Sequence, residues 1–167
     1  MGRTAGVPHQ FSPGPGMYRE LKLRHLLYHS EFKNEREMQH YAFPLLARML
    51  GEENLTNAGI EVAIPPSKDN RWSRGGRVDL YAVGESNTHY LIECKDSRNI
   101  RGLLTGLAQL DFYSYLYKRC TGVKAQKVLL VTNLTEFFTE YLIERHKDVR
   151  LIVLGKQYHA EMEHPNG

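Results

Sequence analysis

Two short stretches decide the fold of this chain, Gly76-Arg-Val-Asp-Leu-Tyr-Ala-Val83 and His89-Tyr-Leu-Ile-Glu-Cys-Lys95. Both are apolar and rich in β-branched and aromatic residues, which predicts two β-strands. The residues between them, Gly84-Glu-Ser-Asn87, are typical of a turn. We therefore expect an antiparallel hairpin at the centre of the fold.

Three charged side chains interrupt these apolar strands: Asp79, Glu93 and Lys95. Residues two apart in a strand point to the same face, so Glu93 and Lys95 project together, and the hairpin can bring Asp79 alongside them. Such groups are costly to desolvate unless they pair or hold a cation. Carboxylate oxygens suit a hard ion such as Mg²⁺ or Mn²⁺. The pattern therefore favours metal-assisted hydrolysis of a phosphodiester.

The composition is that of a soluble globular protein. The chain has 167 residues, 41% of them hydrophobic and 25% charged, which is enough for one domain with a real core. It contains no apolar run long enough to span a membrane, and residues 1–16 lack the hydrophobic segment of a signal peptide. We therefore expect an intracellular, cytoplasmic protein.

The cysteine content and the net charge limit the kinds of metal site and partner that this chain can have. Cys94 and Cys120 are the only cysteines, and their spacing argues against a zinc knuckle, an iron–sulfur cluster or a disulfide framework. The net charge of +3 permits a polyanionic partner without requiring one.

The order of the remaining elements predicts an α/β fold. We expect a flexible arm over 1–16, one domain over 17–156 and a flexible tail over 157–167. Ser30 is the predicted cap of a helix that runs from Glu31 to about Leu50, which Pro44 should kink or restart. Later strands reached through helices favour a central mixed sheet with helices on its faces. The other predicted elements are helices over 18–29, 101–119 and 135–146 and strands over 60–64, 127–132 and 149–154.

Asp79, Glu93 and Lys95, within this order of elements, resemble the PD-(D/E)XK nuclease superfamily. That superfamily has a restriction-endonuclease-like core of helix, three strands, helix and strand (αβββαβ), with two metal-binding acids followed by a lysine. The proline of the name is absent here, because Val78 precedes Asp79. The match covers about residues 31–132. The resemblance implies a divalent-metal-dependent nuclease that acts on DNA, most simply an endonuclease that uses Mg²⁺ or Mn²⁺.

Two further features resemble subgroups of the superfamily. Glu35-Arg-Glu37 is similar to the helix glutamate of archaeal Holliday-junction resolvases, and Gln109-Leu-Asp-Phe-Tyr113 matches the QxxxY element of RecB-type nucleases. The chain lacks the cysteine cluster of the RecB group, and its upstream histidine motif has no clear counterpart. The subgroup, and with it the biological process, stays open.

The resemblance gives each residue of the motif a role. Asp79 and Glu93 would be metal ligands, with the backbone carbonyl of Cys94 completing the site. Lys95 would orient and help to deprotonate the attacking water, and Glu35 would hold a metal-bound water. The alternatives are structural: Asp79 bonded to neighbouring amides, Glu93 paired with a basic neighbour, and Lys95 and Glu35 solvated.

A second set of residues would contact nucleic acid. Gln109 and Tyr113 lie four apart on one helical face and are candidates for the substrate phosphate or the Lys95 region, Gln109 as a catalytic residue and Tyr113 as a nucleic-acid contact. A half-buried helix with a polar edge explains Gln109 and Tyr113 equally well.

The other candidates are basic residues that could neutralise phosphates and a tryptophan that could stack on a base. They are Lys68, Arg71, Trp72, Arg74, Arg77, Arg98 and Arg101. A solvated charged loop would explain the basic residues as well.

Two other functions compete with a nuclease. One is a non-catalytic nucleic-acid-binding module of the same fold. The other is a protein-interaction subunit that docks through the helix over 135–146. Tyr115 and Tyr117 are expected to be packing residues. A homodimer is compatible with the sequence, because two-fold symmetry suits an enzyme that cuts both strands of a duplex.

Overall fold

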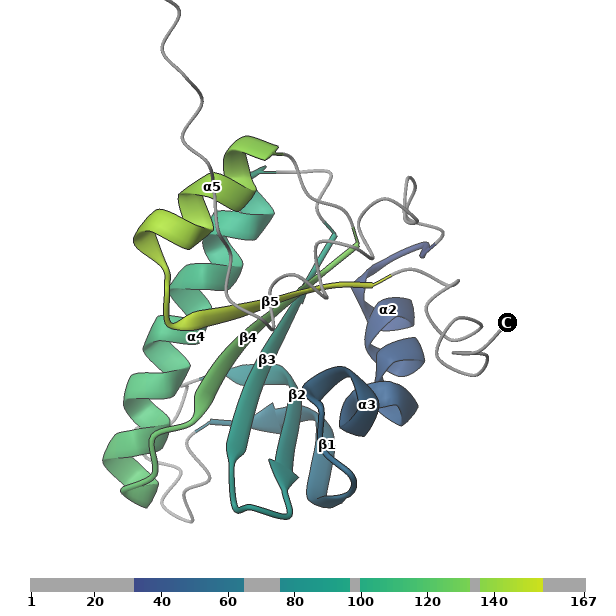
Figure 1. Ribbon diagram of the computed structural model, residues 1–167, viewed down its shortest axis with the longest axis vertical. Coiled ribbons are helices and arrows are strands. Elements are labelled where there is room, and N and C mark those ends of the chain that lie inside the picture. The colour runs from purple at the N-terminus through teal and green to yellow at the C-terminus, as the bar shows by residue number, and fades with distance from the viewer. Residues whose placement is uncertain (1–31, 65–75, 97–99, 133–135, 155–167) are drawn as a thin grey trace, which may run out of the picture.

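Five strands in the described part of the chain form one mixed sheet in the order β1-β2-β3-β4-β5 (Figure 1). The computed structural model describes residues 32–64, 76–96, 100–132 and 136–154. β1, β2 and β3 pair antiparallel, and β3, β4 and β5 pair parallel. The strands are β1 (Leu55–Ala63), β2 (Arg77–Gly84), β3 (His89–Lys95), β4 (Gln126–Val131) and β5 (Val149–Val153).

Helices cover both faces of this sheet (Figure 1). On one face lie α4 (Ile100–Thr121) and α5 (Glu136–Arg145). On the other lie α2 (Glu35–Ala42), the 3₁₀-helix η1 (Phe43–Leu45) and α3 (Leu46–Leu50). The predicted αβββαβ order and mixed sheet are therefore confirmed. The predicted arm (1–16), helix (18–29) and tail (157–167) lie outside the described residues.

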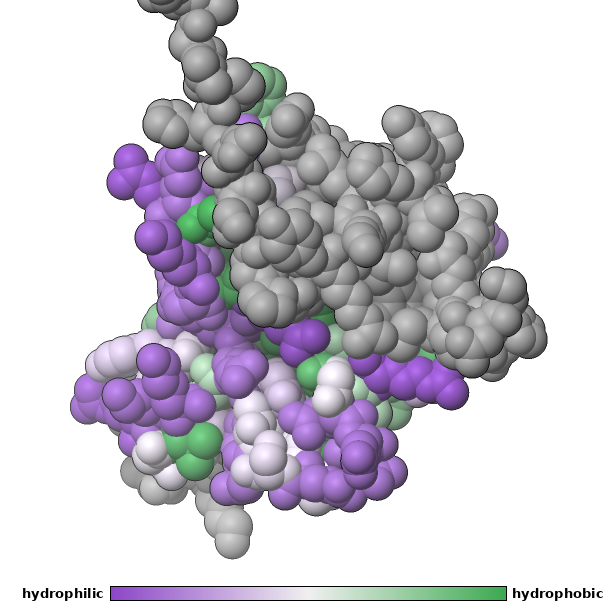
Figure 2. All heavy atoms as spheres, in the orientation of Figure 1, coloured by the Kyte–Doolittle hydropathy of each residue, from purple (hydrophilic) through white to green (hydrophobic). Residues whose placement is uncertain are grey.

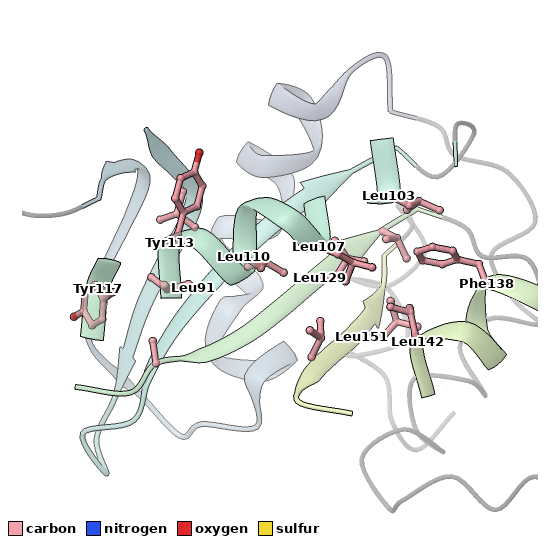
Figure 3. Packing of buried hydrophobic residues seen from close by; sticks show 14 of the residues in the cluster. Leu91, Leu103, Leu107, Leu110, Tyr113, Tyr117, Leu129, Phe138, Leu142 and Leu151 are labelled. Carbon is pink, nitrogen blue, oxygen red and sulfur yellow. The ribbon is translucent and has the colours of Figure 1, made fainter. Parts of the chain in front are cut away.

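The core consists of one apolar layer on each face. Figure 3 shows the α4 side, where Leu103, Leu107 and Leu110 of α4 lie against Leu129 of β4 and Phe138 of α5. The α2–α3 side is filled by another buried cluster that includes Met38, Leu46, Leu80, Ile92 and Cys94. Alternate residues of each strand feed the two layers, as the period of a β-strand requires.

The first described helix begins later than predicted. The cap is Asn34, not Ser30, because the Asn34 side chain accepts a hydrogen bond of 2.9 Å from the backbone N–H of Glu37. Pro44 restarts the helix as predicted: it lies at the beginning of η1, and α3 follows directly.

β1 is longer than the predicted strand over 60–64. Asn57 and Gly59 have low β-propensity, yet they pair with Val83 and Tyr81 of β2. Pairing with a neighbouring strand overrides local propensity here.

The described surface agrees with a charged composition. Where Figure 2 shows described residues, the lower half of that face is mainly hydrophilic. Within the described ranges, no helix is both long and apolar enough to cross a membrane.

Candidate active site

The candidate site lies where two central strands separate. The β2–β3 ladder runs from Val83↔His89 to Leu80↔Ile92 and stops there. Beyond that point β2 continues to pair with β1, and β3 continues to pair with β4 as far as Lys95↔Val131. The sheet therefore forks at the position of Asp79 and Glu93, and the fork leaves backbone groups without a partner strand.

Asp79 fills part of this gap. Its Oδ2 accepts a hydrogen bond of 2.8 Å from the backbone N–H of Cys94. Burial raises the pKa of Asp79, while the Cys94 N–H and the nearby Lys95 charge oppose that rise. The alternative in which Asp79 only hydrogen-bonds neighbouring amides therefore holds for Oδ2. The other carboxylate oxygen, Oδ1, takes no part in that hydrogen bond.

Glu93 is the most unusual group in the described structure. The residue is 1% exposed, and neither carboxylate oxygen has a hydrogen-bond partner among the described residues. Its Oε2 lies 3.4 Å from Lys95 Nζ, an ion-pair contact without hydrogen-bond geometry. Burial, with the charge of Asp79, raises the pKa of Glu93 to about 8. The alternative in which Glu93 pairs with a basic neighbour is therefore realised as an ion pair, but a buried carboxyl group without a hydrogen bond stays costly and favours a proton or a further cation.

Lys95 lies between carboxylates from two elements. Its Nζ is 3.4 Å from Glu93 and 3.7 Å from Oε2 of Glu35, which α2 contributes from its first turn. Burial alone would lower the pKa of Lys95, but the charges of Glu93, Glu35 and Asp79 together raise it. The structure thus brings the helix glutamate and the strand residues together, with Lys95 in its charged form.

Cys94 has its side chain on the other face of β3. It is fully buried in the α2–α3 layer, and burial raises the pKa of its thiol. A protonated thiol on that face is no thiolate ligand, so only the Cys94 backbone carbonyl remains a candidate.

α4 packs directly over Lys95. A Cβ added at Gly106 would lie 2.9 Å from Lys95 Cγ, and one at Gly76 would lie 2.5 Å from the Tyr113 hydroxyl. At 100° per residue, Gly106, Gln109 and Tyr113 share one helical face, so this face runs from Lys95 to the start of β2. Gln109 is half-buried, and its Oε1 lacks a partner among the described residues. Tyr113 is buried in the core.

Of the candidate nucleic-acid contacts, two basic residues are described. Arg77 is exposed at the start of β2 and forms a 3.9 Å ion pair with Glu61, and Arg101 is exposed in the first turn of α4. The remaining candidates, Lys68, Arg71, Trp72, Arg74 and Arg98, lie outside the described residues.

Sequence reasoning missed two residues beside the site. Glu61 falls opposite Asp79, between the pairs Ile60↔Leu80 and Val62↔Val78, and has a φ of 50°. Its charge adds to the rise in the pKa of Asp79. Gln39, one turn after Glu35, is buried with Oε1 unpartnered within the described ranges. Gln39 could have been predicted, because it lies four residues after Glu35 and so on the same face of the helix. No local sequence pattern predicts the left-handed backbone conformation of Glu61.

This donor set fits a divalent cation. Two carboxyl groups converge on the fork, one buried without a donor and the other with an oxygen free of the strand bond. Among the described residues, no group of three or more His, Cys, Asp or Glu side chains forms a metal cluster. An ion held here would therefore need backbone oxygen or water as well, which Mg²⁺ accepts readily.

No protein-family model and no curated protein sequence matches this chain. Two solved structures do resemble it. The first is a repair endonuclease from Pyrococcus abyssi, with 19% identity and a TM-score of 0.51 over 76% of this chain. The second is Can2 from Sulfobacillus thermosulfidooxidans in complex with cyclic tetra-adenylate, with 15% identity and a TM-score of 0.52 over 92% of this chain.

The chain has the restriction-endonuclease-like fold. The predicted fold class is thereby confirmed. This chain spans about half the length of the two similar chains, 49% of the first and 45% of the second. Proteins of this fold typically bind a divalent metal.

Proposed function

We propose that this chain is a divalent-metal-dependent nuclease that hydrolyses DNA phosphodiester bonds, and that it acts as an endonuclease. The observation that carries the proposal is the Glu93 carboxyl group. It is buried without a hydrogen-bond donor among the described residues, and it lies at the fork with Asp79 and Lys95 in a restriction-endonuclease-like sheet. One ammonium group, that of Lys95, cannot balance the charges of both Glu93 and Asp79, so a purely structural ion pair would leave one acid uncompensated.

Asp79, Glu93 and the Cys94 carbonyl would hold Mg²⁺ or Mn²⁺. When bound, the ion would lower the pKa of a water molecule and polarise a phosphoryl oxygen. The backbone N–H of Cys94 fixes one oxygen of Asp79, so this carboxylate is oriented before any ion arrives.

Lys95 would act on the attacking water and on the phosphate. Its ammonium group, held between Glu93 and Glu35, can orient the water and offset the negative charge that builds on the phosphorane. Glu35 limits where the ammonium group lies, and can also hold a water molecule at the edge of the site. Gln109, on the helix face next to Lys95, would donate to a substrate oxygen through its amide nitrogen.

Binding of the DNA backbone would fall to the basic residues around the fork. Arg77 and Arg101 are exposed near the ends of β2 and α4, and we assign Lys68, Arg71, Arg74 and Arg98 the same role on charge alone. Trp72 would stack on a base, and Tyr113 would support the fork from within the core.

The proposal is tested by cleavage of covalently closed plasmid and of labelled linear, single-stranded, flap and four-way-junction DNA. Each is incubated with Mg²⁺, with Mn²⁺ or with EDTA, beside Asp79→Asn. We expect nicking of closed circles that requires the metal and is lost in the variant. Salt-dependent binding without cutting in either metal would replace the proposal with a non-catalytic binding module, and no binding at low salt would contradict both.

A further inference from the structure

α4 is apolar on two opposite faces. One face is buried against the sheet through Leu103, Leu107 and Leu110. The other face carries exposed apolar residues: Ile100 is 53% exposed, Leu104 44%, Phe112 51% and Tyr115 58%. At 100° per residue, positions 104, 108, 112 and 115 fall within an arc of about 80°, centred opposite the buried face. We call Ile100, Leu104, Ala108, Phe112 and Tyr115 the outer stripe.

The outer stripe corrects one prediction. Tyr117 packs in the core, and its hydroxyl lies 2.7 Å from His89 Nδ1, but Tyr115 does not pack. Its ring is exposed, and its hydroxyl accepts a hydrogen bond from Arg119. An amphipathic surface helix presents a polar outer face, whereas a helix that is apolar on both sides is normally covered on both sides. A patch of this kind marks an interaction surface.

We propose that the outer stripe is the interface between two copies of this chain. The stripe is symmetric about Ala108: its large residues lie eight and four residues before this position and four and seven residues after it. Two α4 helices packed antiparallel about a two-fold axis at Ala108 would therefore place Leu104 against Phe112 of the second copy. The small side chain at the axis lets the helix axes approach to about 8–10 Å.

The charges beside the stripe favour the same arrangement. Arg101 lies in the first half of α4, and Tyr115 lies in the second half. Antiparallel packing places Arg101, seven residues before Ala108, opposite Tyr115 of the second copy, seven residues after it, which allows a cation–π contact. Antiparallel packing also sets the two helix dipoles in opposite directions, which is the favourable arrangement for helices that lie side by side. Parallel packing would instead place Arg101 against Arg101 of the second copy.

The size of the stripe predicts a weak dimer. Four large side chains that are each about half exposed offer about 400 Å² per copy, against about 800 Å² per partner in a standard interface. Polar residues beside the stripe would supply the rest. We therefore expect a dissociation constant in the micromolar range.

The same helix also carries the candidate site on its inner face. Gly106, which packs over Lys95, lies on the opposite side of α4 from Ala108, so the two sites of a dimer would be separated by the two paired helices. For a nuclease, this arrangement suits cutting of both strands. That consequence rests on the proposed function, whereas the interface itself does not.

Sedimentation velocity of the full chain, from about 1 to 100 µM and without metal or DNA, tests the proposal independently of nuclease activity. We expect a monomer–dimer equilibrium in the wild type and monomers throughout for Leu104→Glu and Phe112→Glu. Phe137→Glu is the matched control, because Phe137 of α5 is 84% exposed and lies outside the stripe. All three positions are exposed, so the melting temperature of each variant should stay close to that of the wild type.

Cross-linking locates the axis. Ala108→Cys should form an intermolecular disulfide under mild oxidation, whereas the native Cys120, about 18 Å along the helix from the axis, should not. The proposal is overturned by a wild type that stays monomeric at about 100 µM, by dimers that persist in both stripe variants, by dissociation in Phe137→Glu, or by failure of the position-108 cross-link.

Discussion

At the scale of single residues, Glu93 is the group on which the site depends. Its carboxyl is buried beside Asp79 and Lys95, and its pKa is raised to about 8 from a usual value of 4.5. A raised pKa means that the fold favours the protonated acid. This favourable contribution is complete below about pH 4.5 and is lost as the pH rises through about 8. Mg²⁺ must displace that proton, so metal affinity should rise with pH over the same range.

The first prediction concerns Glu93→Gln. In EDTA, the free energy of unfolding of the wild type should fall between pH 5 and pH 9 by up to about 1.4 kcal/mol per pH unit from this group. The Gln variant has no carboxyl proton to lose, so its free energy of unfolding should depend less on pH. At pH 9 it should be more stable than the wild type. Denaturant unfolding at pH 5, 7 and 9 measures this, with Glu53→Gln at an exposed position as control. Equal slopes for wild type and Glu93→Gln would contradict the burial argument.

The second prediction separates the two tasks of Asp79. Asp79→Ala leaves the Cys94 N–H at the fork without its acceptor, whereas Asp79→Asn keeps an oxygen in place. We expect the Ala variant to be less stable than the Asn variant by about 1–3 kcal/mol without metal. Both should lose metal-dependent cleavage. Urea unfolding in EDTA gives the difference, and equal stabilities would show that the hydrogen bond contributes nothing.

The sequence could predict part of this site. Strand periodicity and the hairpin place Asp79, Glu93 and Lys95 together, because those rules act over a few residues. The left-handed backbone of Glu61 and its position opposite Asp79 depend on pairing between β1 and β2. No local pattern encodes that pairing.

At the scale of elements, α4 must come close enough to β3 to hold Lys95 in place. Gly106 permits that approach, because a Cβ there would lie 2.9 Å from Lys95 Cγ and 3.0 Å from Leu129 Cδ1. Gly102, in the same helix, has no heavy atom within 4 Å of such a Cβ. The two glycines form a matched pair within one helix.

The third prediction compares Gly106→Ala with Gly102→Ala. Gly102→Ala should stabilise the protein by up to about 1 kcal/mol and leave cleavage unchanged, since it only adds helix propensity. Gly106→Ala should gain nothing in stability, because the overlap costs about 1–3 kcal/mol. It should also slow cleavage by about tenfold or more, since it displaces Lys95. Thermal unfolding and cleavage rates test both, and indistinguishable variants would refute the packing argument.

The type of a helix or strand was predictable where its sequence pattern was long, but its first and last residues were not. Asn34 competes with Ser30 as a cap, and only the hydrogen bond to Glu37 decides between them. The extra length of β1 comes from its ladder with β2. Because α4 carries apolar residues on two faces, its sequence alone did not show that Tyr117 is buried and Tyr115 exposed.

At the scale of the whole molecule, one side chain links the two ends of the described chain. Arg150 of β5 donates hydrogen bonds of 2.9 Å from its two terminal nitrogens to the carbonyls of Leu50 and Met49, at the end of α3. These carbonyls carry the negative end of the helix dipole. The contact holds the α2–α3 layer, and with it Glu35, against the sheet.

The fourth prediction is that Arg150→Met destabilises the protein by about 2 kcal/mol, because two charge-assisted hydrogen bonds are lost. Arg150→Lys should recover only part of this, since an ammonium group cannot span both carbonyls as a planar guanidinium does. Arg48→Met, at an exposed position of α3, should change stability by less than about 0.5 kcal/mol. Chemical denaturation compares the three, and an Arg150→Met variant as stable as Arg48→Met would contradict this account.

The topology of the sheet was predictable because connection rules are general. A short turn joins the antiparallel strands β2 and β3, and helices join the parallel strands β3, β4 and β5, which yields the mixed sheet; the longer connection from β1 to β2 is not covered by this rule. The choice of DNA structure is not encoded in those rules, because it depends on side chains around the fork and on how two copies assemble.

The cleavage rate of Lys95→Ala, measured beside the wild type at saturating Mg²⁺, tests the central claim most directly. Asp79 and Glu93 remain in this variant, so it should still bind metal, which a Mn²⁺ titration verifies. Loss of the ammonium group beside the attacking water should slow DNA cleavage by about 10²–10⁴-fold. A variant that cuts at the wild-type rate, or a wild type that binds Mg²⁺ and cuts no DNA, would contradict the account.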